Sequence, residues 1–586
     1  MMKSRKKVVI KQKLTKIFFT LIISFSLSSA YAADPKIPTV DDVNREIPNV
    51  KKDLKKNEMP SDAIIDKDKK KVDQVKEEDV TKVFVKSFII RGNKKYPTEI
   101  FEAMVKDKVN KELGYADLRN IINEMSFYYR SKGYLATAFL PEQNVSDGDI
   151  LIYISEGRIG KVEIKTDAKK VLNISRNRIS KFIYNKIDPS DVLNITQLDK
   201  NIRNLNNTPG INAIAQLVEG RMPGETDVVI SASNTKTVNT TSLVDNNGSR
   251  SSGYERITNI LNFDSLLNYG ERFSVTDVIT EGSHYYAGSV TLPIGYDGLQ
   301  STFRISKMEY DLGAPFASTD PTGYSTEYSL ALNKELMTKP DKSLNSSLTF
   351  SRNDYVNDLN TGSNSNKDIS KAILSSTFNI QDKIFSGGAN SFTFSVTGGH
   401  LDLTDNMTSY DTDQLTAKTD GDYWKAALNF NRFQRVTNTV NLNLKFNGQY
   451  TDMNLDGAEQ ISLGGPSAVR AYPGNEAAGD QGFVTSLEAN KMFKGNKKLT
   501  LFGDYGKIQL HKQLWDNWNA TNTKLKNQYD LYGVGLSFSM PIYKNFALTA
   551  TYAEKLGNNP GKDTNGNDVD GLTWDNRSLI SLVGQF

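Results

Sequence analysis

The C-terminal 350 residues of the chain are built of segments in which apolar and polar residues alternate. In Val440 to Tyr450, Val, Leu and Phe occupy alternate positions, and Asn, Lys or Gln lies between them. A strand has this period of two when one face contacts lipid and the other contacts water. Segments of this kind begin near residues 237, 254, 272, 286, 299, 325, 345, 370, 390, 422, 438, 483, 499, 531, 545 and 577. Sixteen such segments predict a closed antiparallel transmembrane β-barrel over residues 235–586, because a soluble β-sandwich does not normally sustain so many.

Two small α+β modules precede this region, at residues 81–160 and 161–234. The first reads, in order, as a strand at 83–91, a helix opening at Pro97, a helix with a one-sided apolar stripe after Asp117, and strands at 134–140 and 150–155. The second repeats part of this order, with strands at 161–165, 211–218 and 227–232 and a helix marked by Leu198, Ile202 and Leu205. The expected fold class is therefore membrane all-β, a sixteen-stranded barrel preceded by two α+β domains.

The N-terminus has the organisation of a secretory signal. Seven Lys or Arg residues and no acid lie in Met1 to Lys16, an apolar run follows, and Ala30-Tyr31-Ala32 supplies a small-x-small cleavage pattern. We expect residues 1–32 to be a signal peptide cleaved between Ala32 and Ala33. Removing its seven basic residues from the total of 72 leaves 65 against 68 acidic residues, so the basic balance of the whole chain does not indicate a nucleic-acid partner.

Residues 33–80 carry too much charge to fold as a domain. Of these 48 positions 11 are basic and 13 acidic, and aromatic residues are few, which predicts a flexible linker. A short helix fits at Thr39 to Glu46, before Pro48 interrupts the pattern.

Composition narrows the function further. The chain has no cysteine, which excludes a disulfide framework, a thiol nucleophile and a cysteine-based metal site. Its three histidines are isolated and do not have the spacing of a zinc or di-iron centre. It shows no catalytic or nucleotide-binding motif, so we expect no enzyme activity, no metal and no cofactor. After the signal no run of eighteen apolar residues remains, so the mature chain can be integral only as a closed barrel.

One arginine, Arg470, lies in a long glycine-rich loop at 463–480, between two of the alternating segments. Further along, Asp504 lies in a strand-like F-x-D-x-G pattern. If the loop folds into the barrel lumen, the two are natural partners, because an unpaired charge in a narrow lumen is costly and a planar guanidinium suits a carboxylate. Spacing alone leaves open an ordinary surface arginine and a turn aspartate.

These stretches resemble the Omp85 superfamily, specifically the outer-membrane exporters of two-partner secretion (TpsB, of the ShlB/FhaC/HecB haemolysin secretion/activation type). The resemblance rests on a V-R-G-[YF] loop motif, a wall motif and loop-closing residues: Val469, Arg470, Ala471 and Tyr472; Phe502, Asp504 and Gly506; Gly464, Gly465, Gly479 and Asp480. Ala471 departs from the family's glycine, so the backbone of the loop tip is expected to differ slightly. Glu488 lies where the family often has an acid.

The first module also resembles the POTRA domain of these exporters. The matching residues are Gly133, Tyr134, Pro141, Gln143, Glu156 and Gly157. We interpret the second module as another POTRA domain. The C-terminal Phe586 resembles the signal by which barrels reach the outer-membrane assembly machinery, and an N-terminal helix plugs the pore in some family members.

The resemblance implies a translocator in the bacterial outer membrane, with POTRA domains in the periplasm. It would recognise a large unfolded TpsA-type exoprotein (an adhesin, a haemolysin or a contact-dependent toxin) and export it without ATP. Its further partners would be outer-membrane lipids and, during biogenesis, the barrel-assembly machinery, with no nucleic acid. The strand that binds the cargo could be the second or the third strand of either module.

Three alternatives stay open. An Omp85-type assembly or insertion factor fits the superfamily, although the Pro141 to Gln143 pattern favours an exporter. A diffusion porin would leave residues 82–234 unexplained. Activation of the exported partner, known for some relatives, leaves no mark in the sequence.

Overall fold

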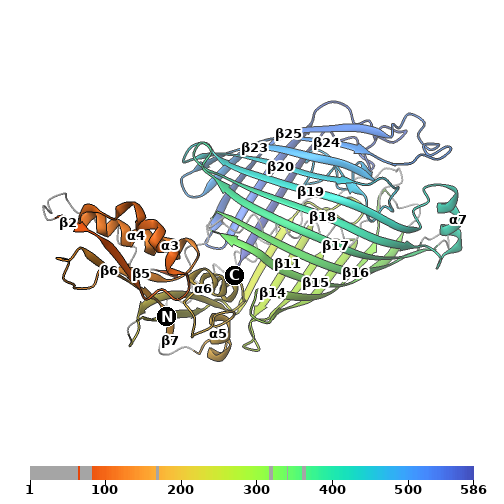
Figure 1. Ribbon diagram of the computed structural model, residues 1–586. Coiled ribbons are helices and arrows are strands. Elements are labelled where there is room, and N and C mark those ends of the chain that lie inside the picture. The colour runs from red at the N-terminus through yellow and green to blue at the C-terminus, as the bar shows by residue number, and fades with distance from the viewer. Residues whose placement is uncertain are drawn as a thin grey trace, which may run out of the picture.

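The computed structural model describes residues 64–65, 82–166, 171–222, 224–315, 321–339, 341–358 and 364–586. Two α+β modules lie beside one end of a large barrel (Figure 1). The expected signal peptide with its Ala32/Ala33 cleavage site, the plug helix and all of the linker except Ile64–Ile65 fall outside the described residues.

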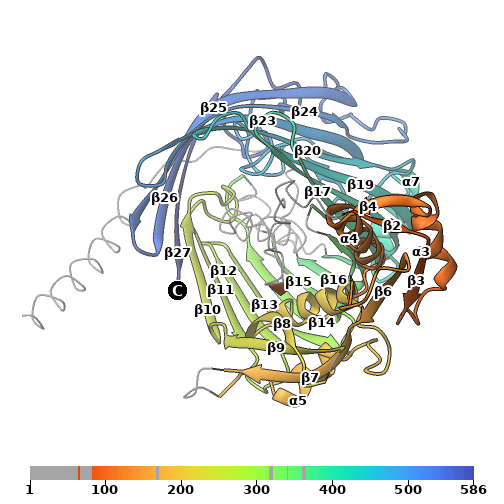
Figure 2. The ribbon, with the colours of Figure 1, turned by 60° about the vertical axis from the view of Figure 1, so that its left-hand side comes forward.

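The predicted sixteen-stranded antiparallel barrel is confirmed. Its strands are β10 (Val238–Asp245), β11 (Arg256–Asp264), β12 (Arg272–Ile279), β13 (Ser283–Ile294), β14 (Leu299–Asp311), β15 (Thr322–Lys339), β16 (Lys342–Asp358), β17 (Asn364–Asp382), β18 (Gly388–Asp402), β19 (Gly421–Arg435), β20 (Val440–Tyr450), β23 (Gln481–Phe493), β24 (Lys497–Gln509), β25 (Gln528–Tyr543), β26 (Phe546–Lys555) and β27 (Asn576–Gln585). Each begins within six residues of its predicted start. The ring closes where β10 pairs with β27 (Figure 2).

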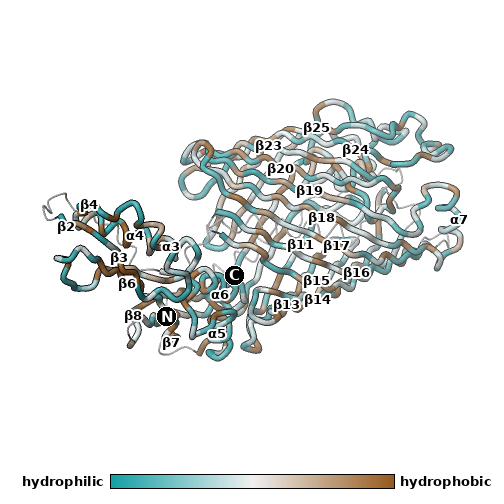
Figure 3. Tube along the Cα trace, viewed as in Figure 1, coloured by the Kyte–Doolittle hydropathy of each residue, from teal (hydrophilic) through white to brown (hydrophobic). Residues whose placement is uncertain are grey.

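The two faces of the wall differ as the alternation requires. Apolar and polar positions follow one another along each strand (Figure 3). The apolar set points outward and is half exposed, as at Phe350, Leu374 and Phe394. Such a band is what a barrel presents to hydrocarbon. None of the described helices is both long and apolar enough to cross a membrane.

The first module packs two helices on a three-stranded sheet of order β3-β6-β5. Its elements are β2 (Lys82–Val85), β3 (Ser87–Arg91), α3 (Thr98–Val105), the 3-10 turn η1 (Lys106–Lys108), β4 (Lys111–Gly114), α4 (Tyr115–Ser131), β5 (Ala136–Phe139) and β6 (Asp149–Glu156). The single strand expected at 83–91 is divided, because the amides of Lys86 and Ser87 both bond to Gly148 O. β4, which pairs with β2, was not expected from the sequence.

The second module has a four-stranded sheet of order β1-β8-β9-β7. It consists of β1 (Ile64–Ile65), β7 (Arg158–Lys165), α5 (Arg176–Ile183), α6 (Ile195–Asn206), β8 (Ile211–Glu219) and β9 (Glu225–Asn234). Helix α5 was missed because it is short and mostly polar; Ile179, Phe182 and Ile183 alone form its buried apolar side. β1 comes from the linker and runs parallel to β8.

The second module is fixed to the turns at its end of the barrel. The Arg178 guanidinium carbon lies 3.6 Å from the ring centroid of Tyr269. Asp297 forms ion pairs with Lys186, Lys200 and Lys334 at 2.8, 3.1 and 3.1 Å. The module therefore lies against the barrel wall through charged and aromatic contacts.

Candidate functional site

The long loop between β20 and β23 packs against the inside of the barrel wall. Its apolar residues are buried together with side chains of β23, β24, β25 and β26: Ile461, Leu463, Val469, Ala471, Tyr472 and Ala477 with Val484, Phe502, Ile508, Leu531 and Ala553. Within the loop, β21 (Ile461–Ser462) and β22 (Ala478–Gly479) form a short antiparallel ladder. Apolar burial therefore holds the loop in one place before any charged contact is considered.

Arg470 lies at the centre of this packing and contacts three wall residues through its guanidinium. It forms a fork on Asp504, with Nε to Oδ2 at 2.9 Å and Nη2 to Oδ1 at 2.7 Å. Its Nη1 donates to Glu488 Oε1 at 3.0 Å and its Nη2 donates to Ser486 Oγ at 2.8 Å. The Arg470 backbone amide also donates to Asp504 Oδ2, at 3.1 Å. The bidentate geometry is one that lysine cannot reproduce.

The F-x-D-x-G segment supplies three different things to this arginine. The ring of Phe502 lies 3.4 Å from the guanidinium carbon, a cation–π distance. Asp504, whose side chain is fully buried, supplies the counter-charge. Gly506 leaves room, because a Cβ there would lie 3.1 Å from both Leu463 and Val469.

Ala471, the residue that departs from the family's glycine, fits the loop tip without strain; that the tip backbone differs from the family's stays a prediction. Ala471 is not among the residues with positive φ, so a Cβ is acceptable at this backbone conformation. Space for that Cβ comes from β25, where Gly533 has no side chain and a Cβ would lie 3.1 Å away. The wall therefore accommodates the alanine.

The remaining motif residues of the loop determine the path of its backbone back to the barrel wall. A Cβ on Gly464 would lie 2.1 Å from Pro473 O, and Gly465 has φ +116°, so both positions require glycine. Gly479 passes close to β24, where a Cβ would meet Gln509 O at 2.5 Å. Asp480 accepts the backbone amides of Leu455 and Lys512 at 3.0 and 2.7 Å, and burial raises the pKa of its carboxyl to about 6.

A second charged cluster, which the sequence reasoning missed, fastens the start of the loop to β17 and β19. Glu459 pairs with Lys371 of β17 and Lys425 of β19, each at 2.7 Å, and is 2 % exposed. Burial opposes ionisation of Glu459, but the two lysines outweigh it and hold the pKa of the carboxyl well below its usual range. Asp456 pairs with Lys367 of β17 at 2.7 Å. The sequence does contain a signal for this cluster, because Lys371 and Lys425 occupy inward-facing positions in segments where apolar and polar residues alternate.

A third buried acid, also missed, lies just after the loop tip. Glu476 accepts from Asn559 Nδ2 and from the Val569 amide, both at 2.8 Å. Burial, with Asp568 nearby, raises the pKa of this carboxyl to about 7. It connects the loop to the segment between β26 and β27.

The POTRA-like residues lie mainly within the first module and at its junction with the second. Gln143 bonds both backbone groups of Leu151, with Pro141 O as a further acceptor. Glu156 Oε1 accepts the Lys94 and Lys95 amides and the Tyr129 hydroxyl.

Three further motif residues lie directly at the junction. Tyr134 bridges to Asn194, and the amide of Gly157 donates to Leu135 O while its carbonyl accepts from the Leu193 amide. Gly133, with φ +84°, ends α4 beside Thr196. Gly133, Tyr134 and Gly157 therefore make structural contacts where the two modules meet.

Phe586 ends the chain inside the closing seam of the barrel. Its amide and carbonyl both bond to Thr240 of β10, at 2.9 and 3.1 Å. Its ring centroid lies 5.4 Å from that of Phe546. The terminal residue therefore adds one pair to the β10–β27 contact.

Known proteins resemble the chain over most of its length. The heme/hemopexin transporter protein HuxB of Haemophilus influenzae (strain 86-028NP) is 23 % identical over 478 residues, covering 80 % of this chain and 82 % of that protein. The outer membrane transporter CdiB of Dickeya dadantii is 23 % identical over 70 % of this chain and 74 % of its own. The solved structure of CdiB from Escherichia coli has the same fold, with a TM-score of 0.70 and 18 % identity over 95 % of this chain and 100 % of that one.

Two family models match the chain itself. The ShlB-type POTRA domain matches residues 83–157, the first module. The haemolysin secretion/activation protein ShlB/FhaC/HecB matches residues 224–521, half of the chain. The chain thus belongs to the ShlB/FhaC/HecB family and is a two-partner secretion transporter of the outer membrane.

Proposed function

We propose that this transporter binds one large unfolded exoprotein in the periplasm. It passes the exoprotein through the barrel when the long loop between β20 and β23, here called the lumen loop, leaves its resting position. The observation that carries the proposal is the loop itself, which packs inside the lumen and is held to β23 and β24 by Arg470 and to β17 and β19 by Glu459. An exoprotein in the lumen would compete with the loop for space, so we propose that the loop shifts during export. The candidate cargoes are an adhesin, a haemolysin, a contact-dependent toxin and a protein that binds haem or hemopexin.

Sheet order reduces the number of strands that can bind the cargo by edge addition. Of the four candidates, β6 lies between β3 and β5, and β9 lies between β8 and β7, so neither has a free edge. The candidates that remain are β5 in the first module and β8 in the second. The outer edge of β8 pairs with β1 at two residues, Ile64 and Ile65. A cargo strand would extend β5 directly or replace β1 on β8.

The transport needs no chemistry from the protein. The family consists of transporters, and we propose no catalytic role for any residue. Arg470 and Asp504 would hold the resting loop, and the folding of the cargo outside the cell would supply direction. The apolar exterior would contact outer-membrane lipids, and the C-terminal strand ending in Phe586 would engage the assembly machinery during insertion.

Deletion of the gene, followed by comparison of the surface and culture-fluid proteins with those of the parent strain, tests the proposal. Loss of one very large protein, with other barrels unchanged, is expected, and a plasmid copy should restore it. Loss of many outer-membrane proteins together would contradict an exporter and favour an assembly factor. An unchanged set of exported proteins would also contradict it.

A further inference from the structure

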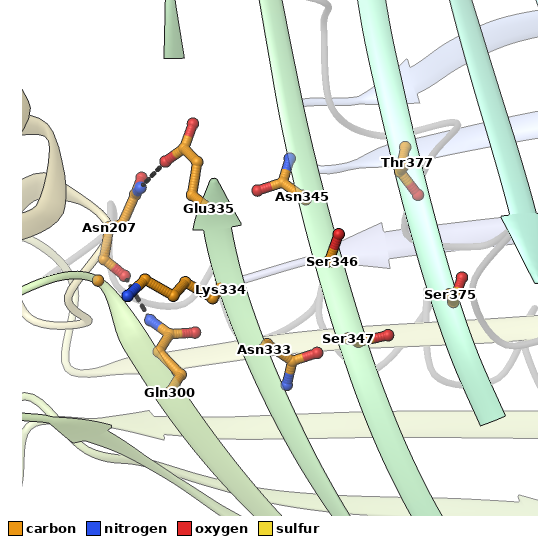
Figure 4. Close-up of a pocket in the computed structure, with 11 residues that line it drawn as sticks. Asn207, Gln300, Asn333, Lys334, Glu335, Asn345, Ser346, Ser347, Ser375 and Thr377 are labelled. Carbon is orange, nitrogen blue, oxygen red and sulfur yellow. Dashed lines mark hydrogen bonds between the residues drawn. The ribbon is translucent and has the colours of Figure 1, made fainter. Parts of the chain in front are cut away.

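At the periplasmic end of the lumen, a hollow of about 480 Å³ lies between the second module and the barrel wall. Asn207, directly after α6, forms one side of the hollow, and strands β14 to β17 form the other. The side-chain amide of Asn207 donates to Glu335 Oε2 at 2.7 Å, and the backbone carbonyl of Asn207 accepts from Gln300 Nε2 at 3.1 Å (Figure 4). The hollow therefore lies where a chain leaving the second module reaches the pore.

The strand register extends this hollow into a band of polar, uncharged side chains along the lumen wall, here called the polar track. One row crosses β14 to β18 and the next crosses β16 to β19, and all members point inward: Gln300, Asn333, Ser347, Ser375 and Ser395; Asn345, Thr377, Thr393 and Asn429. Of the described residues that line the hollow, Glu335 and Lys334 are charged, and Glu335 is bonded to Asn207. Lys334 of the hollow is paired with Asp297.

Several track side chains have free hydrogen-bonding groups. Within the described part of the chain, Asn333, Asn345 and Ser347 have no hydrogen-bond partner for their side chains, although Asn333 lies opposite Ser347 on the neighbouring strand. Higher in the lumen the wall is charged instead, at Lys371 and around Arg470. The track thus differs from these charged parts of the lumen by offering donors and acceptors without charge.

We propose that the polar track binds the main chain of the unfolded exoprotein as it enters the barrel, a subsite that rests on the proposed function. Every residue of an extended chain carries one N–H donor and one C=O acceptor, and both need partners wherever water is displaced. Amide and hydroxyl side chains supply both kinds of group. Each such bond replaces a bond to water and changes an equilibrium by about two- to tenfold, so binding is weak and repeated along the track. An uncharged wall neither attracts nor repels charged side chains, so acidic and basic cargo segments bind it equally well.

Because the chain has no cysteine, one introduced cysteine can report which wall the cargo touches. Ser347→Cys places it on the track, and Leu348→Cys, the next residue on the same strand, places it on the lipid face. Each is labelled with a benzophenone maleimide in cells that export the protein identified by the deletion experiment. Illumination should join Ser347→Cys, and not Leu348→Cys, to that protein. The adduct should disappear when the cargo gene is deleted.

A triple variant, Asn333→Ala/Asn345→Ala/Ser347→Ala, should slow export by about tenfold, since three weak bonds are lost. The matched variant Ser537→Ala/Ser539→Ala/Thr551→Ala removes lumen hydroxyls from β25 and β26 and should export normally. Heat-modifiable gel migration shows that each barrel is inserted. An adduct from Ser539→Cys with none from Ser347→Cys would overturn the track while leaving the exporter function intact, and so would normal export by the triple variant. Export that does not depend on the gene at all would overturn the function itself.

Discussion

Arg470 contacts Asp504, Glu488 and Ser486 with its side chain, and its backbone amide also contacts Asp504. Breaking a buried ion pair by removing one partner typically costs about 3–5 kcal/mol, because the remaining charge stays buried and unpaired. The position of the loop therefore depends on this one guanidinium as well as on the apolar packing of the loop.

Arg470→Lys should lower export by at least about tenfold while the barrel still inserts. An ammonium cannot form the fork on Asp504 and reach Glu488 and Ser486 together, so the loop would not return to one defined position between rounds of export. Secretion of the partner into culture fluid, with gel migration as the test of insertion, measures the effect. Arg352→Lys serves as control, because that arginine is 59 % exposed and surface pairs contribute little. Secretion at the parental level by Arg470→Lys would refute a specific role for the fork.

Glu476 should make loop stability depend on pH. Its pKa is raised from 4.5 to about 7 by burial and by Asp568, so between these values the folded protein holds a proton that the unfolded chain has lost. The free energy of unfolding then decreases as pH rises through this window, by up to about 3 kcal/mol, and is constant above it. The midpoint of thermal unfolding in detergent, followed from pH 5 to 8, should fall less in Glu476→Gln. The exposed Glu554→Gln should keep the parental slope, and an unchanged slope in both would exclude this role.

At the scale of elements, long elements with clear periodicity were predictable and short ones were not. Each barrel strand repeats the alternation over eight or more residues, so their order and approximate starts could be inferred. β1, β4 and α5 contain two, four and eight residues, and tertiary pairing determines them more than local pattern does. The same division applies to the site, because Arg470 and Asp504 lie in motifs, whereas Glu459 acquires its partners from distant strands and Glu476 from the segment between β26 and β27.

The pairing of β1 with β8 should limit access of cargo to the second module. It comprises two residue pairs, against nine between β8 and β9, so a longer incoming strand can replace it. The double change Ile64→Pro/Ile65→Pro removes the amide donors of β1 and should increase the affinity of the purified transporter for the N-terminal secretion domain of its partner. Calorimetry measures the change, with Lys71→Pro in the same linker as control. Equal or weaker binding by the double variant would argue that cargo uses β5 instead.

At the scale of the whole molecule, the barrel is closed by its shortest contact. β10 and β27 pair over five residues, from Thr241 to Asp245, whereas β16 and β17 pair over seventeen. Phe586 adds bonds to Thr240 at one end of this seam. The route of the cargo can therefore be tested there, since a path through the lumen leaves the seam closed and a lateral path opens it.

Joining the seam by a disulfide should leave export intact if the lumen is the route. Leu243 and Val583 are register partners, at a spacing that a disulfide can span, and no other cysteine competes in Leu243→Cys/Val583→Cys. Oxidised cells should secrete the partner at the parental rate, as should cells carrying Leu348→Cys/Leu374→Cys across β16 and β17. Secretion that stops on oxidation of the seam pair alone, and returns with a reductant, would show that the wall must open. The lumen loop and the polar track would then lie beside the route of the cargo, and their charges and amides would serve only to keep the closed barrel in shape.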